Sequence, residues 1–145
     1  MTPKARARKC ADVMFAQDSA SAGLGMTIED VTPGGAVLSM SVRADMLNGH
    51  GICHGGFIFT LADSAFAFAC NSYNQTTVAQ QNQITYLSPG QPEERLTATA
   101  REVSRSGRSG IYDVTVTGAD DRVVALFRGL SRSIKGQLFS EEEPT

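Results

Sequence analysis

A long run of apolar residues at positions 57–70 dominates the pattern of hydrophobic and polar positions along the chain. Strict alternation is absent, and apolar side chains cover most of the circumference when the run is drawn as a helix, so it predicts a helix buried on nearly all sides. Its polar residues, Thr60, Asp63 and Ser64, are three or four positions apart and fall on one stripe with Ala67. We therefore expect a buried helix with one narrow polar face.

Segments of strand type lie on both sides of this helix. Two precede it, at residues 26–31 and 36–43, and the turn sequence Thr-Pro-Gly-Gly between them predicts a hairpin. Turn signals divide the sequence after the helix into four more segments, at residues 78–87, 95–105, 110–117 and 122–134. Because no long crossover separates the last three, we expect an antiparallel meander. The last strand begins apolar on both faces, which favours a central position.

The remaining segments complete the expected organisation. Residues 3–17 place apolar side chains on one face and basic ones on the other, which predicts an amphipathic helix within residues 1–18. Residues 19–25 are small and polar and are expected to form a connector. Residues 137–145 are expected to be a flexible tail.

We expect a single domain over residues 1–145, because there is no internal repeat and no linker. Its fold class is α+β, with an antiparallel sheet of about five to six strands wrapped around the long central helix. This arrangement is the hotdog fold, and two copies can pair their sheets edge to edge.

Composition narrows the function classes. A chain of 145 residues with 41% hydrophobic residues can bury a core without staples, and its net charge of −2 gives no reason to expect nucleic acid. No apolar run approaches the length that spans a membrane, and no signal-peptide core follows the basic start. The three cysteines form no CxxC pair, which favours a reducing cytoplasm and gives no disulfide framework or zinc site.

A polar, glycine-rich loop at residues 48–56 leads directly into the helix. Gly55 and Gly56 let a ligand approach the backbone, and the first N–H groups of a helix have no internal partners. Such a helix end stabilises developing negative charge, as on a carbonyl oxygen under attack. Asp63 alone could be a structural cap or ion-pair partner, but a buried carboxylate beside this loop favours a chemical role.

Gly55 and Asp63 are too far apart to serve one reacting group from a single helix. Eight residues correspond to about 12 Å along the axis, whereas a nucleophile and an oxyanion donor must each lie about 3 Å from the reacting group. Two antiparallel helices across a two-fold axis would solve this, with Gly55 from one subunit and Asp63 from the other. This hypothesis predicts an obligate dimer.

This combination resembles the hotdog-fold acyl-CoA thioesterases of the phenylacetate-degradation (PaaI) type. The motif is Asn48, then His54-Gly55-Gly56 after five residues, then Asp63 after six more, and the resemblance extends over residues 20–135. Small and apolar helix residues and a Gly/Asp turn before the last strand also match.

The resemblance implies a role for each motif residue. Asp63 would be the nucleophile or general base, and the Gly55 N–H would polarise the thioester carbonyl, with His54 and Asn48 completing the catalytic set. The family's active site is formed by two subunits, as the spacing above requires. One turn after the acid, where the family often has Thr or Ser, this chain has Ala67.

Other residues are candidates for contacts with the substrate. Arg105 and Arg108 flank a tight turn and could bind the phosphates of coenzyme A, although a solvated hairpin tip is the alternative. Gln81 and Gln83 alternate with Asn82 and Ile84, so at least one amide is expected to face the site or a subunit contact. The predicted substrate-binding residues are Gly56, Asn71, Gln81, Arg105 and Arg108.

Competing chemistries have weaker support. His50 and His54 lack a third ligand for a metal, and Cys53 beside His54 is expected to be a buried thiol. The chain has neither a GxSxG elbow nor a Walker loop.

The resulting prediction is a cytoplasmic thioester hydrolase that acts on an aryl- or arylacetyl-CoA. It would be a homodimer with intersubunit active sites that assembles further into a tetramer. It would need no metal and no cofactor, because coenzyme A is part of the substrate. The alternatives are a non-catalytic acyl-CoA-binding module and a hydratase or dehydratase of the same fold.

Overall fold

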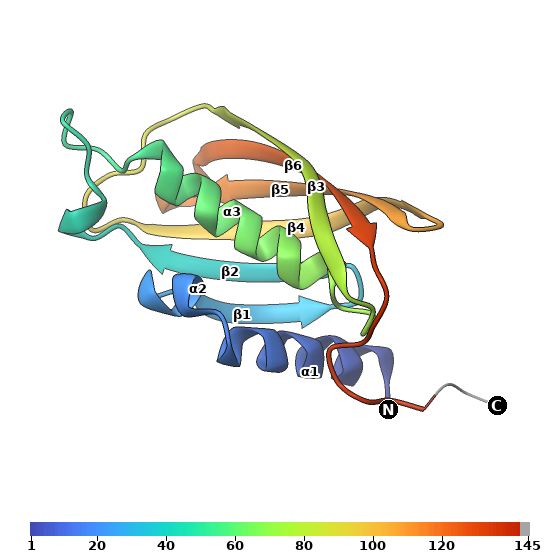
Figure 1. The fold of residues 1–145 in the computed structure, drawn as a ribbon. Coiled ribbons are helices and arrows are strands. Elements are labelled where there is room, and N and C mark those ends of the chain that lie inside the picture. Colours follow the sequence, from blue (N-terminus) through green and yellow to red (C-terminus); the bar gives the residue numbers. More distant parts are fainter. Residues whose placement is uncertain (143–145) are drawn as a thin grey trace.

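The computed structural model describes residues 1–142 and has the expected hotdog arrangement of a long helix held by an antiparallel sheet (Figure 1). Along the chain the helices and strands are α1 (Pro3–Ala16), α2 (Ser19–Gly23), β1 (Thr27–Thr32), β2 (Gly35–Ser41), α3 (Gly55–Cys70), β3 (Thr77–Tyr86), β4 (Arg95–Ser106), β5 (Ser109–Thr117) and β6 (Val123–Ser133). No helix within these described residues is long and apolar enough to cross a membrane.

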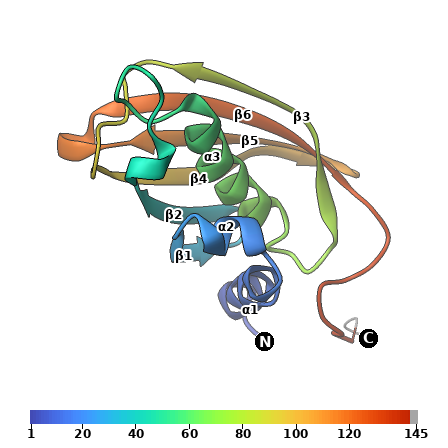
Figure 2. The same cartoon turned by 60° about the vertical axis from the view of Figure 1, so that its left-hand side comes forward.

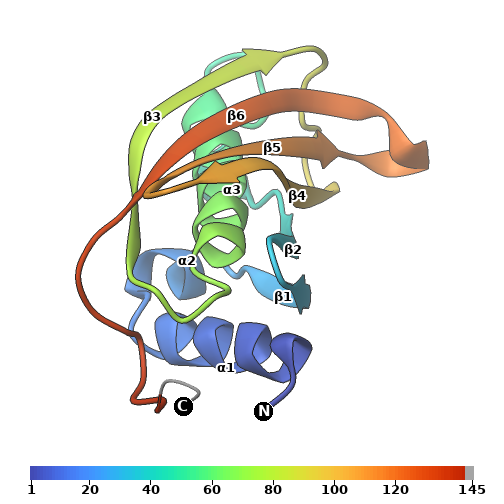
Figure 3. The ribbon, with the colours of Figure 1, turned by 90° about the vertical axis from the view of Figure 1, so that its right-hand side faces the viewer.

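The six strands form one sheet in the order β1-β2-β4-β5-β6-β3, and every neighbouring pair is antiparallel. The predicted meander is confirmed as β4-β5-β6, and β6 is an interior strand between β5 and β3. β1 and β3 are therefore the two edges. The sheet curves around α3, while α1 packs beside β1 at the edge far from β3 (Figures 2 and 3).

Helix α3 fills the concave face of the sheet because most of its circumference is apolar. Its buried residues include Ile58, Leu61, Ala62, Ala65, Phe66, Phe68 and Ala69. The predicted polar stripe is confirmed as the less buried side of the helix, since Thr60, Asp63, Ser64 and Ala67 are all only partly buried. The strands supply the opposite wall of the core with apolar side chains, among them Leu38, Met40, Leu96, Val114, Val116 and Phe127.

Close packing between α3 and the sheet depends on a glycine. The Phe66 ring lies 5.6 Å from the Tyr112 ring and 5.9 Å from the Phe127 ring, centroid to centroid. A Cβ atom added to Gly129 on β6 would lie only 2.7 Å from Phe66 Cε2. The absence of a side chain on this interior strand lets the helix approach the sheet closely.

The start of α3 and the structure of the connector before β1 differ from expectation. Helix α3 begins at Gly55, two residues earlier than the apolar run, because His54 supplies the cap. The expected connector at residues 19–25 contains the short helix α2, whose N-cap Asp18 accepts a hydrogen bond from the Ser21 N–H. Polar composition alone does not reveal such a capped turn.

The expected tail begins as an ordered segment against α1. Glu141 forms an ion pair with Arg6 at 2.8 Å, and the Asn74 side chain accepts hydrogen bonds from the N–H groups of Leu138 and Phe139. Residues 143–145 of that predicted tail lie outside the described residues.

Candidate active site

The loop before α3 is organised by Asn48. Its Oδ1 accepts hydrogen bonds from the backbone N–H groups of His50, at 2.9 Å, and Ile52, at 3.4 Å. A single antiparallel bridge joins Leu47 to Cys53 and closes the base of the loop. Asn48 therefore shapes the approach to the helix, and it does so through the loop backbone and without contact to His54.

His54 is the N-cap of α3. It has extended backbone angles, φ −60° and ψ 132°, and its Nδ1 accepts a hydrogen bond from the Gly56 N–H at 2.9 Å. This satisfies one of the unpaired donors at the start of the helix. The Gly56 N–H is consequently occupied, whereas the Gly55 N–H has no acceptor among residues 1–142.

Gly55 lies against Tyr86 of β3. The Tyr86 hydroxyl donates a hydrogen bond to the Gly55 carbonyl oxygen at 2.9 Å, and a Cβ added at Gly55 would lie 3.0 Å from Tyr86 Cζ. Tyr86 thus holds the first turn of the helix through the Gly55 carbonyl oxygen, and the Gly55 N–H remains available to a ligand. This is the geometry of an anion-binding helix end, and Tyr86 had no distinguishing signal in the sequence.

Asp63 stands on the polar stripe of α3 with one hydrogen-bond donor. Asn82 of β3 donates from Nδ2 to Asp63 Oδ1 at 2.9 Å. Burial raises the pKa of the Asp63 carboxyl above its usual value, and the Asn82 hydrogen bond partly opposes that rise. No cation within the described residues pairs with this carboxylate, so Asp63 is neither a helix cap nor half of a salt bridge.

The other polar residues of the stripe have structural partners. Thr60 donates from its hydroxyl to the Gly56 carbonyl oxygen at 2.8 Å, and the Ser64 hydroxyl is hydrogen-bonded to Ser21 of α2 at 2.8 Å. Asp63 is thus the one charged side chain of the predicted stripe, and its hydrogen-bond partner lies on β3.

The amides of β3 differ in their contacts, and the substrate contact predicted for Gln81 stays a prediction. Asn82 reaches the site, whereas Gln81 is exposed and makes no contact with Asp63. Successive side chains on a strand point to opposite faces, so Asn82 lies on the same face of β3 as the apolar Ile84. The position of Ile84 in the sequence therefore indicated that Asn82, and not Gln81, faces the helix.

Asn71 is a structural residue, contrary to the prediction that it contacts substrate. Its side chain is only 3% exposed. Its Nδ2 donates to the carbonyl oxygens of Ala67 and Thr77, both at 2.9 Å, and its Oδ1 accepts from the Thr77 N–H at 2.9 Å. The amide is fully used in joining the end of α3 to β3.

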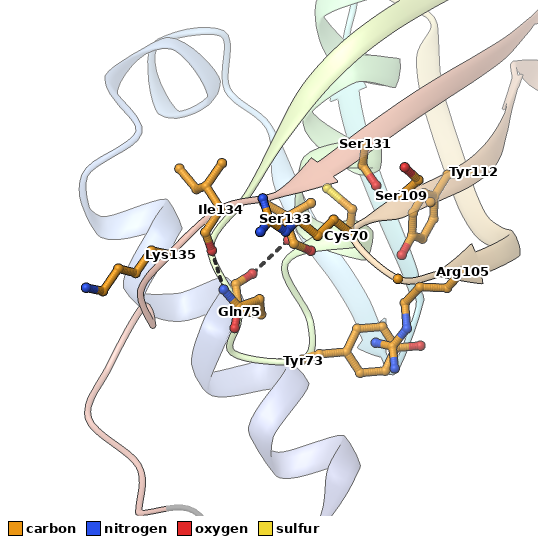
Figure 4. Close-up of a pocket in the computed structure, with 14 residues that line it drawn as sticks. Cys70, Tyr73, Gln75, Arg105, Ser109, Tyr112, Ser131, Ser133, Ile134 and Lys135 are labelled. Carbon is orange, nitrogen blue, oxygen red and sulfur yellow. Dashed lines mark hydrogen bonds between the residues drawn. The ribbon is translucent and has the colours of Figure 1, made fainter.

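Arg105 and Arg108 line a pocket of about 630 Å³ at the C-terminal end of α3 (Figure 4). The Arg105 guanidinium lies 3.6 Å from the centre of the Tyr73 ring, which holds it by a cation–π contact. Lys135 contributes a third cation, and Ser109, Ser131 and Ser133 contribute hydroxyl groups. Cys70, which lines this pocket, is the last residue of α3, whereas the loop before α3 meets the helix at Gly55, so the two lie at opposite ends of the helix.

The cysteines near the site are poor nucleophiles. Burial raises the pKa of the Cys53 thiol and raises that of Cys70 to about 12, so both are protonated at neutral pH. His50 is exposed on the loop, and residues 1–142 contain no cluster of three His, Cys, Asp or Glu side chains that could hold a metal ion.

Comparison with known proteins is consistent with this geometry. A family model described as "Thioesterase superfamily" matches residues 50–125, which include the end of the loop and all of α3. The acyl-coenzyme A thioesterase PaaI of Escherichia coli (strain K12) is 43% identical over 131 residues, which cover 90% of this chain and 94% of that protein.

Two solved structures extend the comparison to the fold. The E. coli PaaI protein from the phenylacetic acid degradation operon superposes with a TM-score of 0.92 and 41% identity, covering 94% of this chain and 99% of that one. A hypothetical thioesterase from Streptococcus pneumoniae TIGR4, solved with coenzyme A, gives a TM-score of 0.78 at 28% identity over 87% and 96% of the two chains. With this fold, this helix start and these relatives, the chain belongs to the thioesterase superfamily, among its PaaI-like hotdog acyl-CoA thioesterases.

Proposed function

We propose that this chain hydrolyses the thioester of an aryl- or arylacetyl-CoA, of the phenylacetyl or hydroxyphenylacetyl type, to the free acid and coenzyme A. The observation that carries the proposal is that α3 holds two groups that remain free to act on a substrate. Asp63 is a partly buried carboxylate without a cation, and Gly55 has an N–H without an acceptor. The aromatic acyl group is favoured because the E. coli relative belongs to a phenylacetic acid degradation operon.

The reaction needs little from the protein because a thiolate is a good leaving group. The Gly55 N–H would stabilise negative charge on the carbonyl oxygen during attack. Asp63 would either attack the carbonyl carbon, giving a mixed anhydride that water then hydrolyses, or take a proton from an attacking water. In both routes the C–S bond breaks and the thiolate of coenzyme A leaves.

Each active site would be shared by two subunits. Gly55 and Asp63 belong to one continuous helix, so their axial separation of about 12 Å prevents both from reaching one thioester. The edge strand β3 exposes apolar side chains, with Val78 44% and Tyr86 48% exposed. Pairing of two β3 edges would cover these side chains and bring two antiparallel copies of α3 together, and such dimers would assemble further into tetramers.

The cationic pocket would take the phosphates of coenzyme A. In an antiparallel helix pair, the partner's loop lies over the C-terminal half of α3, the half that ends at this pocket. A pantetheine arm leaving the thioester near Asp63 could then follow the helix towards Cys70, which lines the pocket. Arg105, Arg108 and Lys135 would supply positive charge to the phosphate oxygens.

Release of free thiol from a panel of short, long and aromatic acyl-CoAs tests the proposal, with wild type compared with Asp63→Asn. We expect turnover that is fastest with aromatic acyl groups and a loss of about 10²–10⁴-fold in the variant, the usual contribution of a catalytic acid or base. Subunit mass and a folding check accompany each assay. If a folded wild-type dimer releases thiol from none of these substrates, the chain is an acyl-CoA-binding module. If it adds water to an enoyl-CoA without releasing thiol, it is a hydratase.

A further inference from the structure

The Asn82 side chain makes a contact that the proposed reaction does not yet use. Asn82 pairs with Gly129 across β3 and β6, and its amide reaches over to α3. Its Nδ2 donates to Oδ1 of Asp63, and it is the one side chain in residues 1–142 with a hydrogen bond to this carboxylate. The second carboxylate oxygen, Oδ2, receives no hydrogen bond from the described part of the chain.

The other end of the Asn82 amide is unsatisfied. Asn82 Oδ1 is buried and has no hydrogen-bond partner within residues 1–142. An ionised carboxylate repels an amide oxygen, so Nδ2 must face Asp63 and Oδ1 must face away, where nothing donates to it. A buried acceptor without a partner costs stability. The one hydrogen bond of the Asn82 side chain within residues 1–142 is therefore the one that its nitrogen donates to Asp63.

We propose that Asn82 is a positioning residue for the thioester hydrolysis proposed above. It holds Oδ1 of Asp63 in place and thereby presents Oδ2 as the oxygen that meets the thioester carbon or the attacking water. It also supplies the hydrogen bond that favours the ionised form of the acid in a partly buried site. Ala67, one turn further along α3, has no polar group that could share this role.

The titration of Asp63 gives a readout for this role, because the titratable groups packed near the site stay neutral. On α3 itself, the pKa of Cys70 is raised to about 12 by burial. On β3 and β5 the pKa values of Tyr86 and Tyr112 are raised, in both cases mainly by burial. The NMR titration of the Asp63 carboxyl, compared with the acid limb of the rate profile, decides whether that limb belongs to Asp63.

Two variants of similar side-chain volume remove the donor. Asn82→Leu leaves no polar group, and Asn82→Asp replaces the donor with a second carboxylate. Gln83→Leu is the matched control, because Gln83 is exposed on the neighbouring position of β3, whose side chain points to the opposite face. Activity is measured as kcat/KM against pH, and the Asp63 carboxyl is titrated by NMR in the same proteins.

We expect kcat/KM to fall by about 10- to 100-fold in Asn82→Leu, the usual effect of losing a hydrogen bond to a charged group. The acid limb and the Asp63 titration should both move to higher pH, and further still in Asn82→Asp because of like-charge repulsion. Asn82→Leu should unfold more easily than wild type at neutral pH, because the ionised Asp63 loses its one donor, and this difference should shrink at acid pH, where Asp63 is protonated. Gln83→Leu should leave the rate profile unchanged.

Two results would overturn the inference. In the first, both Asn82 variants keep the acid limb and the Asp63 titration of wild type, which would make Asn82 a packing residue. The other is a shift of the same size in Gln83→Leu. A wild type that releases no thiol contradicts the proposed function instead, and the NMR titration then still decides whether Asn82 controls Asp63.

Discussion

Asp63 is a carboxyl group that the fold holds partly out of water with a single neutral donor. Burial raises its pKa in the folded state. In the window between the unfolded and the folded pKa, the folded protein binds more protons, so stability falls as pH rises through that window. Above this pH window, Asp63 is ionised in the folded protein, and the fold carries the full cost of desolvating its carboxylate. The group proposed for catalysis is therefore one that weakens the fold at neutral pH.

Replacing this carboxylate should stabilise the protein. In Asp63→Asn the amide oxygen can still accept from Asn82, but no charge is desolvated, so we expect a gain of about 0.5–2 kcal/mol at neutral pH, as is common when a functional group is removed. The gain should shrink as pH falls through the window between the raised pKa of folded Asp63 and the usual aspartate pKa, and it should be absent below that window. Denaturant unfolding at neutral and acid pH, at one protein concentration, measures it. If the variant is no more stable than wild type at pH 7, interactions of the ionised Asp63 carboxylate in the folded protein offset its desolvation cost.

Arg105 provides a second test at the level of one side chain. If the cationic pocket binds the phosphates of coenzyme A, Arg105→Ala should raise KM for acyl-CoA by about tenfold, roughly one hydrogen-bonded charge contact, with little change in kcat. The same acyl group on a truncated thiol without the nucleotide provides the control. A KM that rises equally for both substrates would place Arg105 elsewhere in the mechanism, or in the support of Tyr73, on which it stacks.

At the scale of elements, the start of α3 combines a cap with a proposed oxyanion donor. Gly55 is the first helical residue, a position that accepts proline. His54 has the extended ψ of 132° that suits a residue before proline. Gly55→Pro therefore removes the N–H without breaking the helix, and Gly55→Ala adds a similar Cβ near Tyr86 while keeping the N–H.

The comparison of these two variants isolates the donor. We expect kcat of Gly55→Pro to be about 10²–10³-fold below that of Gly55→Ala, the usual cost of one oxyanion donor. Helix content by circular dichroism should be alike in both. Equal rates in the two variants would assign carbonyl polarisation to another group.

A second link between elements joins the residues before β4 to the turn before β6. Glu94 forms an ion pair with Arg122 at 2.7 Å and accepts hydrogen bonds from the N–H groups of Gln91 and Ala119. The Arg122 hydrogen bond is the main cause that lowers the pKa of Glu94 to about 2. Because the pKa of folded Glu94 is depressed, this stabilisation is complete above the usual glutamate pKa of 4.5 and is lost as pH falls towards 2.

Glu94→Gln should therefore lower stability at pH 7 by about 1–3 kcal/mol, because Arg122 and two N–H groups lose a charged acceptor. The difference from wild type should disappear as the pH of the unfolding experiment approaches 2. Asp12→Asn is the control, since the Arg8–Asp12 pair is exposed and worth little. A loss of equal size in both variants would show that the burial of Glu94 adds nothing.

The elements themselves were largely predictable from the sequence. Alternation and turn signals placed all six strands, and the apolar run placed α3, because hydrophobic periodicity directly reflects burial against one core. The short helix α2 was missed because its stability comes from the Asp18 cap and from the Ser21–Ser64 contact with α3. Such tertiary support leaves no periodic pattern in five residues.

The site was predictable only in part. Asp63 and Gly55 stood out because a carboxylate in an apolar helix and glycines at its start are costly without a purpose. The partners Asn82 and Tyr86 depend on which face of an edge strand meets the helix, and one residue of register reverses that choice. The bulge between Ala79 and Gln81 shifts the pairing of β3 with β6. The structural role of Asn71 depends on its hydrogen bonds to Ala67 and Thr77, which have no signature in the sequence. The substrate contact predicted for Gln81 stays a prediction.

At the scale of the whole molecule, one protomer is half of the proposed site. Gly55, the proposed oxyanion donor, and the Asp63 carboxylate lie at different positions along the axis of α3. The edge strand β3 has an unpaired backbone edge and exposed apolar side chains. A dimer with a two-fold axis would contain two sites, each with Gly55 from one subunit and Asp63 from the other. Subunit mixing tests this arrangement without any structure of the dimer.

Two inactive variants should restore activity when their subunits exchange. A dimer of one Asp63→Asn and one Gly55→Pro subunit would have one site with both defects and one with intact Gly55 and Asp63. Random exchange at equal amounts should give about a quarter of wild-type activity, because half of the dimers are mixed and each has one of two sites intact. The controls are each variant exchanged with itself and the pair combined without exchange. Mass spectrometry verifies that mixed dimers have formed. If their activity is no higher than that of the controls, each site is built within one subunit, and α3 must bend or the substrate must contact it differently.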